Sequence, residues 1–234
     1  MDEARALVEK GMLDESVVVA ARQTQGRGRR GRKWDSLPGN LFMTYIYRHD
    51  CPLSIAPQLS FVACVSVGEA LRSFIPPGNT ITYKWPNDVL LNGKKVAGIL
   101  LETIELSGQE ENAYLIACGL NITDFPKDVR YPATSLQEES ILLAYEEILN
   151  SIVISLQKHL MAWSEQGFSS IYTLWMRDAA YIDASVTIDL QGKIQSGIFK
   201  GLDKDGAMLL KTSDGLMTIN AGEVLAGGTH AFSN

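Results

Sequence analysis

The chain has 234 residues, of which 46% are hydrophobic and 21% are charged, and its mean hydropathy is +0.01. This balance is typical of a folded globular protein and excludes an intrinsically disordered chain, a collagen and a small disulfide-rich scaffold. The length fits one large domain or one domain with a small appendage, because single cores rarely grow beyond roughly 250 residues. No apolar run in the sequence approaches the roughly 20 residues that a membrane span needs.

The cysteines and the start of the chain bear on its cellular compartment. Cys51, Cys64 and Cys118 are widely spaced and form no C-x-x-C pair, which argues against a disulfide framework and against a zinc site. The first residues read as a charged helix and not as a secretory signal. We therefore expect a cytoplasmic protein with free thiols and no membrane partner.

Positive charge is concentrated in one segment. The formal net charge is −6, yet six of the 21 basic residues fall between positions 22 and 33, while the other 15 stand against 27 acidic residues. The six are Arg22, Arg27, Arg29, Arg30, Arg32 and Lys33. A concentrated positive segment on an acidic body predicts a local anion site, since a nucleic-acid-binding surface usually spreads its charge along a whole face.

In chain order, the first third of the sequence predicts helices and strands around this basic segment. The predicted elements are a helix over 2–10, a strand over 16–21, a strand over 41–47 and a helix over 56–74. The strands are rich in β-branched and aromatic residues, whereas apolar residues recur at helical spacing in the helices. The basic segment, residues 22–34, is called the arginine loop below, and it connects two predicted strands.

The middle of the chain predicts four short strands and then two helices. The strands span 81–84, 89–91, 96–102 and 113–118, and the helices span 140–163 and 168–178. Asn92-Gly93 between two apolar runs is a strong hairpin signal. After Tyr181 only short strands and turns follow. We therefore predict a larger domain over 1–180 and a small all-β domain over 181–234.

The glycines of the arginine loop have two possible interpretations. Gly26, Gly28 and Gly31 spell G-x-G-x-x-G after a strand, but the dinucleotide-binding motif needs its third glycine inside a helix, and W-D-S-L-P-G at 34–39 cannot continue one. Glycine alternating with arginine instead lets the backbone approach a ligand while guanidinium groups converge on carboxylate or phosphate oxygens. A flexible RNA-binding arm is the alternative. Trp34 either joins the core or covers a flat ring beside the arginines.

A second group of polar residues surrounds the predicted hairpin. In K-W-P-N-D at 84–88 the proline fixes a turn, which presents Asn87 and Asp88 at a strand edge, while Lys95 begins the next strand. The alternatives are that Asn87 and Asp88 hydrogen-bond their own turn and that the lysines are solvated. Gly98 inside a strand suggests close approach by a ligand or by backbone. Gly-Leu-Asn at 119–121 is a weak signal by itself.

Four motifs together resemble the biotin protein ligase family. They are G-R-G-R-R-G-R-K-W at 26–34, K-W-P-N-D at 84–88, G-K-K-V-A-G-I-L at 93–100 and G-L-N at 119–121. The resemblance implies an α/β (α+β) fold, with a mixed β-sheet and flanking helices similar to class II aminoacyl-tRNA synthetases. It also implies a small SH3-like β-barrel as the C-terminal domain, which ends near Gly222-Glu223-Val224.

The same resemblance implies a two-step reaction. Biotin and Mg-ATP form biotinyl-5′-AMP and pyrophosphate, and a lysine of a biotin carboxyl carrier domain then attacks the mixed anhydride. The motif match assigns biotin binding to Gln23, Gly26, Arg27, Gly28, Arg29, Lys95 and Gly98. It assigns ATP binding to Arg29, Arg32, Trp34, Asn87, Lys95, Gly119 and Asn121. Arg29, Lys95 and Asp88 are the expected catalytic residues, no metal ligand is assigned, and a homodimer is allowed.

Two features separate this sequence from the full family pattern. A Ser-Thr-Asn stretch normally precedes the D-E-A-R-A-L helix, whereas this sequence starts at Met1. Either the start is truncated, which predicts weak biotin binding, or another residue substitutes. No helix-turn-helix precedes the catalytic region, which predicts a ligase without DNA binding. Asp88 is expected to orient or deprotonate the acceptor lysine, and a Mg²⁺ or phosphate contact is its alternative role. A lipoate or octanoyl ligase and an adenylate-binding relative with little turnover are the alternative functions.

Overall fold

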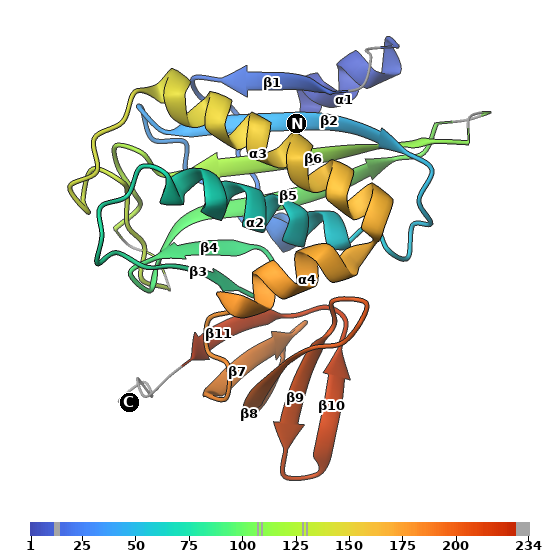
Figure 1. Ribbon diagram of the computed structural model, residues 1–234, viewed down its shortest axis with the longest axis vertical. Helices are drawn as coiled ribbons and strands as arrows, with labels where there is room; N and C mark the ends of the chain where they lie inside the picture. Colours follow the sequence, from blue (N-terminus) through green and yellow to red (C-terminus); the bar gives the residue numbers. More distant parts are fainter. Residues whose placement is uncertain (12–14, 107, 109, 128, 130, 228–234) are drawn as a thin grey trace.

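The computed structural model describes residues 1–11, 15–106, 108, 110–127, 129 and 131–227. A six-stranded sheet carries three helices on one face, and a smaller five-stranded sheet lies below it (Figure 1). The six strands are β1 Ser16–Ala20, β2 Leu41–His49, β3 Ile81–Lys84, β4 Asp88–Leu91, β5 Lys94–Ile104 and β6 Asn112–Leu120. All of these lie where the sequence predicts strands, although β5 and β6 are longer than expected.

The larger sheet has the order β1-β2-β6-β5-β4-β3. Each pairing between these named strands is antiparallel. Within the described residues, parallel contacts occur as isolated bridges from Tyr83 to Ala179 and from Lys95 to Ala133. The central strand β2 is buried on both faces from Leu41 to Tyr47, which explains why its sequence is nearly continuous in apolar residues.

Helices cover the two faces of this sheet unequally. They are α1 Asp2–Glu9, α2 Gln58–Arg72, α3 Tyr145–Gln166 and α4 Phe168–Arg177. In Figure 1, α2, α3 and α4 lie together over one face, where they form the main core. The short helix α1 instead packs Ala4 and Val8 against Ile46 and Leu115, whose side chains point to the opposite face. Much of that second face is therefore left for other contacts.

The start of α3 differs from the prediction. Its apolar period begins at Ile141, but the helix begins at Tyr145. Ser140 has a left-handed backbone with φ of 61°, and the Ile141 N–H donates to the Leu136 carbonyl at 2.8 Å. Ile141 is buried from an extended segment. It therefore contributes to the core without being helical, which periodicity alone cannot distinguish.

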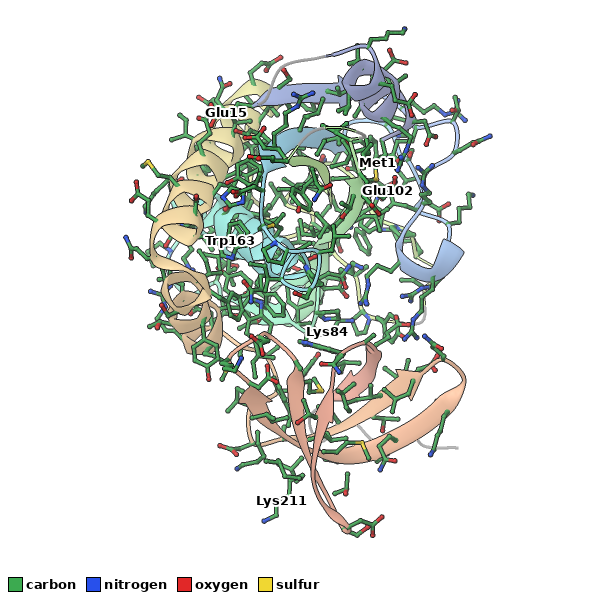
Figure 2. The ribbon with its side chains drawn as sticks, turned by 90° about the vertical axis from the view of Figure 1, so that its right-hand side faces the viewer. Met1, Glu15, Lys84, Glu102, Trp163 and Lys211 are labelled. Atoms are coloured by element: carbon green, nitrogen blue, oxygen red, sulfur yellow. The ribbon has the colours of Figure 1, made fainter. Side chains whose placement is uncertain are left out.

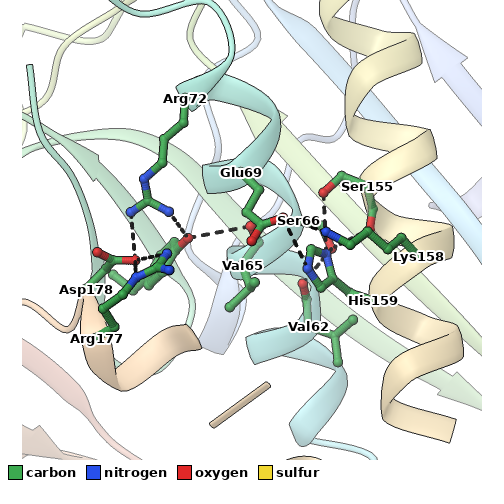
Figure 3. Close-up of polar contacts among 11 residues, drawn as sticks. Val62, Val65, Ser66, Glu69, Arg72, Ser155, Lys158, His159, Arg177 and Asp178 are labelled. Carbon is green, nitrogen blue, oxygen red and sulfur yellow. Dashed lines mark hydrogen bonds and ion pairs between the residues drawn. The ribbon is translucent and has the colours of Figure 1, made fainter. Parts of the chain in front are cut away.

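A polar network fastens the helices to one another and to the sheet (Figure 3). His159 of α3 lies with Nδ1 3.2 Å from Ser66 Oγ and Nε2 3.4 Å from Glu69 Oε2, both on α2. Farther along α2, Arg72 pairs with Asp178 after α4 at 2.8 Å. These contacts tie α2, α3 and the end of α4 into one layer behind the sheet.

The C-terminal residues form a second antiparallel sheet. Its strands are β7 Ser185–Leu190, β8 Lys193–Leu202, β9 Met208–Thr212, β10 Gly215–Ile219 and β11 Glu223–Gly227, in the order β10-β9-β8-β7-β11. Strands β10 and β11 are the two ends of this order, and no pairing between them closes the sheet within the described residues. Trp85 Nε1 of the first region donates to the Gly206 carbonyl at 3.1 Å. The division between residues 180 and 181 stays a prediction.

Candidate active site

A cavity of about 620 Å³ lies on the sheet face away from α2, α3 and α4. Its walls come from the arginine loop, the start of α1, strands β3 to β6 and Glu223 of the C-terminal sheet. Its size falls in the range of small-molecule sites. The predicted site residues that line it are Gln23, Arg27, Gly28, Arg29, Arg32, Trp34, Asn87, Asp88, Lys95, Gly98, Gly119 and Asn121.

Gly26 is the predicted site residue that does not line this cavity. A methyl group added to it would lie 2.7 Å from Gln23 Oε1 and would also overlap the Trp34 carbonyl oxygen. The Trp34 N–H donates to the Gly26 carbonyl at 2.9 Å. Gly26 therefore closes the base of the loop and acts on the cavity through Gln23 and Trp34.

Sheet register brings three predicted residues into one row. Asp88 on β4 stands opposite Gly98 on β5, which stands opposite Gly119 on β6. The Trp34 indole lies directly on the two glycines, because a methyl group at Gly98 would be 2.8 Å from Cζ3 and one at Gly119 would be 2.6 Å from Cε2. The close approach predicted at Gly98 is therefore made by an aromatic ring of the protein itself.

The Trp34 indole also lies close to a cation of the cavity. Lys95 Nζ lies 5.2 Å from the indole ring, within the range of a cation–π contact. The indole Nε1 is buried and meets no hydrogen-bond acceptor within the described residues. A buried donor without a partner is costly, so the geometry marks Nε1 as a group that a bound ligand can satisfy.

Asp88 is enclosed by two lysines. Lys95 Nζ lies 2.6 Å from Asp88 Oδ1, and Lys84 Nζ lies 2.8 Å from Oδ2. Burial by itself would raise the pKa of Asp88, but the two ammonium groups outweigh this effect and hold the pKa of Asp88 well below its usual range. The carboxylate is thus anionic, buried and engaged at both oxygens, which makes it a weak proton acceptor.

Arg29 stands out among the cations of the loop. Its Nη1 donates to Asn87 Oδ1 at 3.4 Å and to the Gly222 carbonyl at 3.2 Å, both of which are neutral acceptors. Burial, with a further contribution from the neighbouring Arg30, lowers the pKa of Arg29 from its ordinary value. A half-buried guanidinium held by neutral oxygens is suited to bind an anionic ligand.

Three other arginines of the loop, Arg27, Arg30 and Arg32, are already paired within the protein. Arg27 forms ion pairs with Asp2 at 2.6 Å and with Glu102 at 3.1 Å, and Arg32 pairs with Glu223. Arg30 donates to the Asp189 carbonyl at 3.3 Å. These contacts anchor both ends of the loop. They argue against a free RNA-binding arm, and they correct the expectation that every guanidinium of the loop converges on a ligand.

Two asparagines assigned to the nucleotide hold the backbone around the cavity. Asn87 Nδ2 donates to the Ile99 carbonyl at 2.6 Å, and Asn121 Nδ2 donates to the Thr134 carbonyl at 3.0 Å. Asn121 is also buried. Both residues line the cavity, with their amide nitrogens engaged in shaping it.

Sequence reasoning missed three residues that line the cavity. Lys84 is buried against Asp88, and its Nζ lies 4.4 Å from the ring centre of Tyr131. Glu223 reaches the cavity from the C-terminal sheet. Lys84 had a signal, since it starts the K-W-P-N-D motif and pairs across the β3–β4 hairpin with Asp88. Tyr131 had none, and Glu223 was noted only as part of Gly222-Glu223-Val224 in the C-terminal domain, without a link to the site.

Other site chemistries receive no support in the described part of the chain. No cluster of three or more histidine, cysteine or acidic side chains suited to a metal occurs among those residues. The three cysteines are free and buried, and burial raises the pKa of each thiol, that of Cys118 to about 12. No described helix combines the length and apolar composition needed to cross a membrane.

Comparison with known proteins connects this geometry to a family. Residues 7–122 match the Biotin/lipoate A/B protein ligase family, and residues 181–227 match the Biotin protein ligase C terminal domain. The biotin--[acetyl-CoA-carboxylase] ligase of Paracoccus denitrificans is 35% identical over 224 residues, which cover 93% of each chain. The bifunctional ligase/repressor BirA of Bacillus subtilis is 32% identical over 96% of this chain and 70% of its own length.

A solved structure agrees with these sequence matches. The biotin protein ligase of Aquifex aeolicus, in complex with biotin and ATP, superposes with a TM-score of 0.77 at 30% identity. The match covers 94% of this chain and 92% of that one. The arginine loop, the Lys95–Asp88 pair and the glycines Gly98 and Gly119 lie together at one cavity. These observations agree with the sequence and structure matches, and the chain belongs to the biotin protein ligase family.

Proposed function

We propose that this chain activates biotin with ATP as biotinyl-5′-AMP and transfers the biotinyl group to a lysine of a biotin carboxyl carrier domain of a carboxylase. The observation that carries the proposal is the placement of two cations, Arg29 and Lys95, at one cavity. Joining a carboxylate to a nucleotide phosphate brings two anions together, and fixed cations at that point lower the barrier. The Aquifex aeolicus relative, crystallised with biotin and ATP, supports the choice of substrates.

In the first half-reaction, a biotin carboxylate oxygen attacks the α-phosphorus of ATP. A phosphorus–oxygen bond forms to biotin, the bond to the β-phosphate oxygen breaks, and pyrophosphate leaves. Arg29 and Lys95 are placed to bind the crowded phosphate, and each contact of this kind is worth about 3 kcal/mol of barrier. Mg²⁺ would arrive with ATP, held mostly by phosphate oxygens and water.

The remaining site residues divide between the two substrates in this proposal. Biotin and its carboxylate would contact Gln23, Arg27, Gly28, Arg29 and Lys95, whereas Gly26 would act through Gln23 and Trp34, and Gly98 through the Trp34 indole that lies on it. The nucleotide would contact Arg29, Arg32, Trp34, Asn87, Lys95, Gly119 and Asn121. Because Arg32 is paired with Glu223, a phosphate would have to replace that carboxylate before Arg32 takes part.

In the second half-reaction, the carrier lysine must lose a proton before it attacks, since a free lysine has a pKa of about 10.4. Asp88 was expected to orient or deprotonate this acceptor lysine, with a Mg²⁺ or phosphate contact as the alternative. Its oxygens are taken by Lys84 and Lys95 and its pKa is low, which argues against removal of the proton and supports a different role, orientation of Lys95. The base is then solvent or another group in the complex with the carrier.

The carrier domain is the proposed macromolecular partner, and a homodimer is a further possibility that the fold allows. Strand β1 ends the larger sheet, and Val19 on it is 40% exposed. An end strand of this kind can pair with another chain. A cytoplasmic location and the lack of DNA and membrane partners stay expectations.

The test is transfer to an apo carrier domain. The chain, ATP, Mg²⁺ and the carrier are incubated with biotin, with lipoate or with octanoate, and the carrier is examined by mass spectrometry. We expect one biotinyl group on the acceptor lysine, none when that lysine is replaced by arginine, and none with the other two acids. Transfer of lipoate or octanoate would contradict the proposal. Binding of biotinyl-5′-AMP without transfer would indicate an adenylate-binding relative.

A further inference from the structure

Two lysine side chains share the proposed adenylate cavity. Lys84 ends β3 and Lys95 lies near the start of β5, and Asp88 at the start of β4 bridges them at 2.8 and 2.6 Å (Figure 2 labels Lys84 at the junction of the two sheets). The side chain of Lys84 is 7% exposed and that of Lys95 25%. Both residues line the cavity, and Asp88, which both amines contact, lines it as well, so both amines lie at the wall of the space where a reactive acyl group would form.

This arrangement creates a chemical hazard. A mixed anhydride reacts with a neutral amine, whereas an ammonium ion has no lone pair with which to attack. Burial disfavours the charged form of a lysine and therefore promotes the reactive neutral amine. A ligase that stores biotinyl-5′-AMP beside its own buried lysines would acylate itself unless those lysines stayed protonated.

We propose that Asp88 prevents self-acylation by holding Lys84 and Lys95 as ammonium ions, so that the anhydride is kept for the carrier lysine. This inference rests on the proposed function, because it requires biotinyl-5′-AMP in the cavity. It gives the carboxylate a role that neither orientation of Lys95 nor general base catalysis contains. It also explains why one carboxylate is engaged by two amines, since Lys84 has no assigned contact with either substrate.

The charges around this group agree with the inference. Besides the two lysines, Arg29 of the arginine loop interacts with Asp88, because the negative charge of Asp88 raises the pKa of Arg29 and so opposes the lowering by burial. The Tyr131 ring lies on the far side of Lys84 Nζ at 4.4 Å. With Asp88 neutralised, the lysines would face one another and Arg29 without a compensating carboxylate. Repulsion between like charges would then add to burial in favouring loss of a proton.

The reaction that Asp88 suppresses can be written in full. The neutral Nζ of Lys95 attacks the carbonyl carbon of the biotinyl group. A carbon–nitrogen amide bond forms, the carbon–oxygen bond to the phosphate breaks, and AMP leaves with the bonding electrons. The nitrogen releases its remaining extra proton to solvent. The product is a chain that carries one biotinyl amide inside its own active site.

The test compares wild type with three variants, all supplied with synthetic biotinyl-5′-AMP in the absence of carrier. We expect Asp88→Asn to acquire one biotinyl group at Lys95 or Lys84 at least about tenfold faster than wild type, as when the neutral fraction of an amine rises by one power of ten. Asp88→Glu keeps the negative charge and should therefore label more slowly than Asp88→Asn. Asp88→Asn combined with Lys84→Arg and Lys95→Arg should lose the labelling. Peptide mapping by mass spectrometry identifies the modified lysine.

Equal labelling of wild type and Asp88→Asn at these two lysines would overturn the inference. So would label that appears only on exposed lysines such as Lys33, because that pattern reports escaped anhydride. Since the adenylate is supplied ready-made, a failure to form it from biotin and ATP counts against the proposed function alone. If calorimetry shows that wild type does not bind biotinyl-5′-AMP, both the proposed function and this inference are contradicted.

A second measurement covers the case in which Asp88→Asn does not fold. Wild-type protein is treated with acetic anhydride across a range of pH, and for each lysine the pH at which acetylation reaches half of its maximal rate is determined as its midpoint. Because accessibility changes the maximal rate and not this midpoint pH, buried and exposed lysines can be compared. We expect the midpoints of Lys84 and Lys95 to be no lower than that of Lys33, which is 83% exposed at its side chain. Lower midpoints would show neutral amines beside Asp88 and would overturn the inference.

Discussion

At the residue scale, the shape of the cavity depends on where side chains are missing. Gly98 and Gly119 stand opposite each other on β5 and β6 and carry the Trp34 indole. The sequence predicts a close approach at Gly98, because glycine in a strand usually has such a reason. It does not reveal that the approaching group is Trp34, since that contact joins residues 64 and 85 positions apart.

Gly119→Ala tests the contact between the Trp34 indole and the two glycines. The added methyl group would overlap the indole, and overpacking of this kind costs typically 1–3 kcal/mol. Because Trp34 lies on a loop, we expect it to move aside, with binding of biotinyl-5′-AMP weakened about tenfold or more. Calorimetry on Gly119→Ala, Trp34→Ala and the double variant tests whether the displaced indole causes this weakening. The losses of binding free energy in the two single variants should be far from additive in the double variant, and full additivity would show that Gly119 acts without Trp34.

The arginine loop shows what a sequence leaves undecided about residues. Its composition predicts an anion site, and the cavity does contain Arg29. Arg27 and Arg32, by contrast, are paired with Glu102 and Glu223. Nothing in the local sequence separates these arginines, because their partners are brought close only by the fold.

At the element scale, hydrophobic periodicity predicted the helices and strands well. Its one clear failure is the start of α3, where Ile141 is buried from an extended segment before Tyr145 begins the helix. Register lay beyond the sequence as well. The row from Asp88 through Gly98 to Gly119 follows from pairing among β4, β5 and β6, which alternation within single strands does not specify.

The contact between α2 and α3 predicts a pH dependence of stability. Burial lowers the pKa of His159 below its ordinary 6.5, and the opposing effect of Glu69 is smaller. The unfolded chain therefore takes up this proton at a higher pH than the folded one. Folding stability should be fully present above pH 6.5 and should decrease as pH falls below it, by at most about 1.4 kcal/mol per pH unit.

Urea unfolding of wild type and His159→Gln from pH 7.5 to 5.5 measures this effect. The carboxyl groups with lowered pKa values, such as Asp88 and Glu102, titrate at lower pH in both states, so they contribute little in this window. Wild type should lose stability toward pH 5.5, while His159→Gln should change much less. A parallel decrease in both proteins would assign the pH dependence to other groups.

At the scale of the whole molecule, the C-terminal sheet helps to hold the arginine loop. Arg29 donates to the Gly222 carbonyl, Arg30 donates to the Asp189 carbonyl, and Arg32 pairs with Glu223. The small domain was predicted from its composition, but its contact with the site was not. Strand patterns show that a β-rich domain exists, whereas they do not show which of its ends meets another domain.

Glu223→Gln should loosen the arginine loop. An ion pair with an exposed arginine stabilises the closed loop by less than about 1 kcal/mol. The fraction of molecules in which the arginine loop is detached from the C-terminal sheet should therefore rise, by no more than about fivefold. Limited digestion of the unliganded protein with trypsin measures this change, because a detached loop should be cleaved faster within residues 27–33. Asp214→Asn, which removes a charge at the exposed β9–β10 turn, is the matched control and should digest at the wild-type rate. An unchanged loop in Glu223→Gln would contradict the account.

Activation of biotin in this cavity can be measured by separating the two half-reactions. Pyrophosphate release from Mg-ATP is followed without carrier for wild type and Lys95→Ala, and transfer from supplied biotinyl-5′-AMP to carrier is followed for the same proteins. The account predicts a biotin-dependent burst from wild type, and a far larger loss in the burst than in the transfer for Lys95→Ala. Release that does not depend on biotin, or equal losses in both half-reactions, would contradict it.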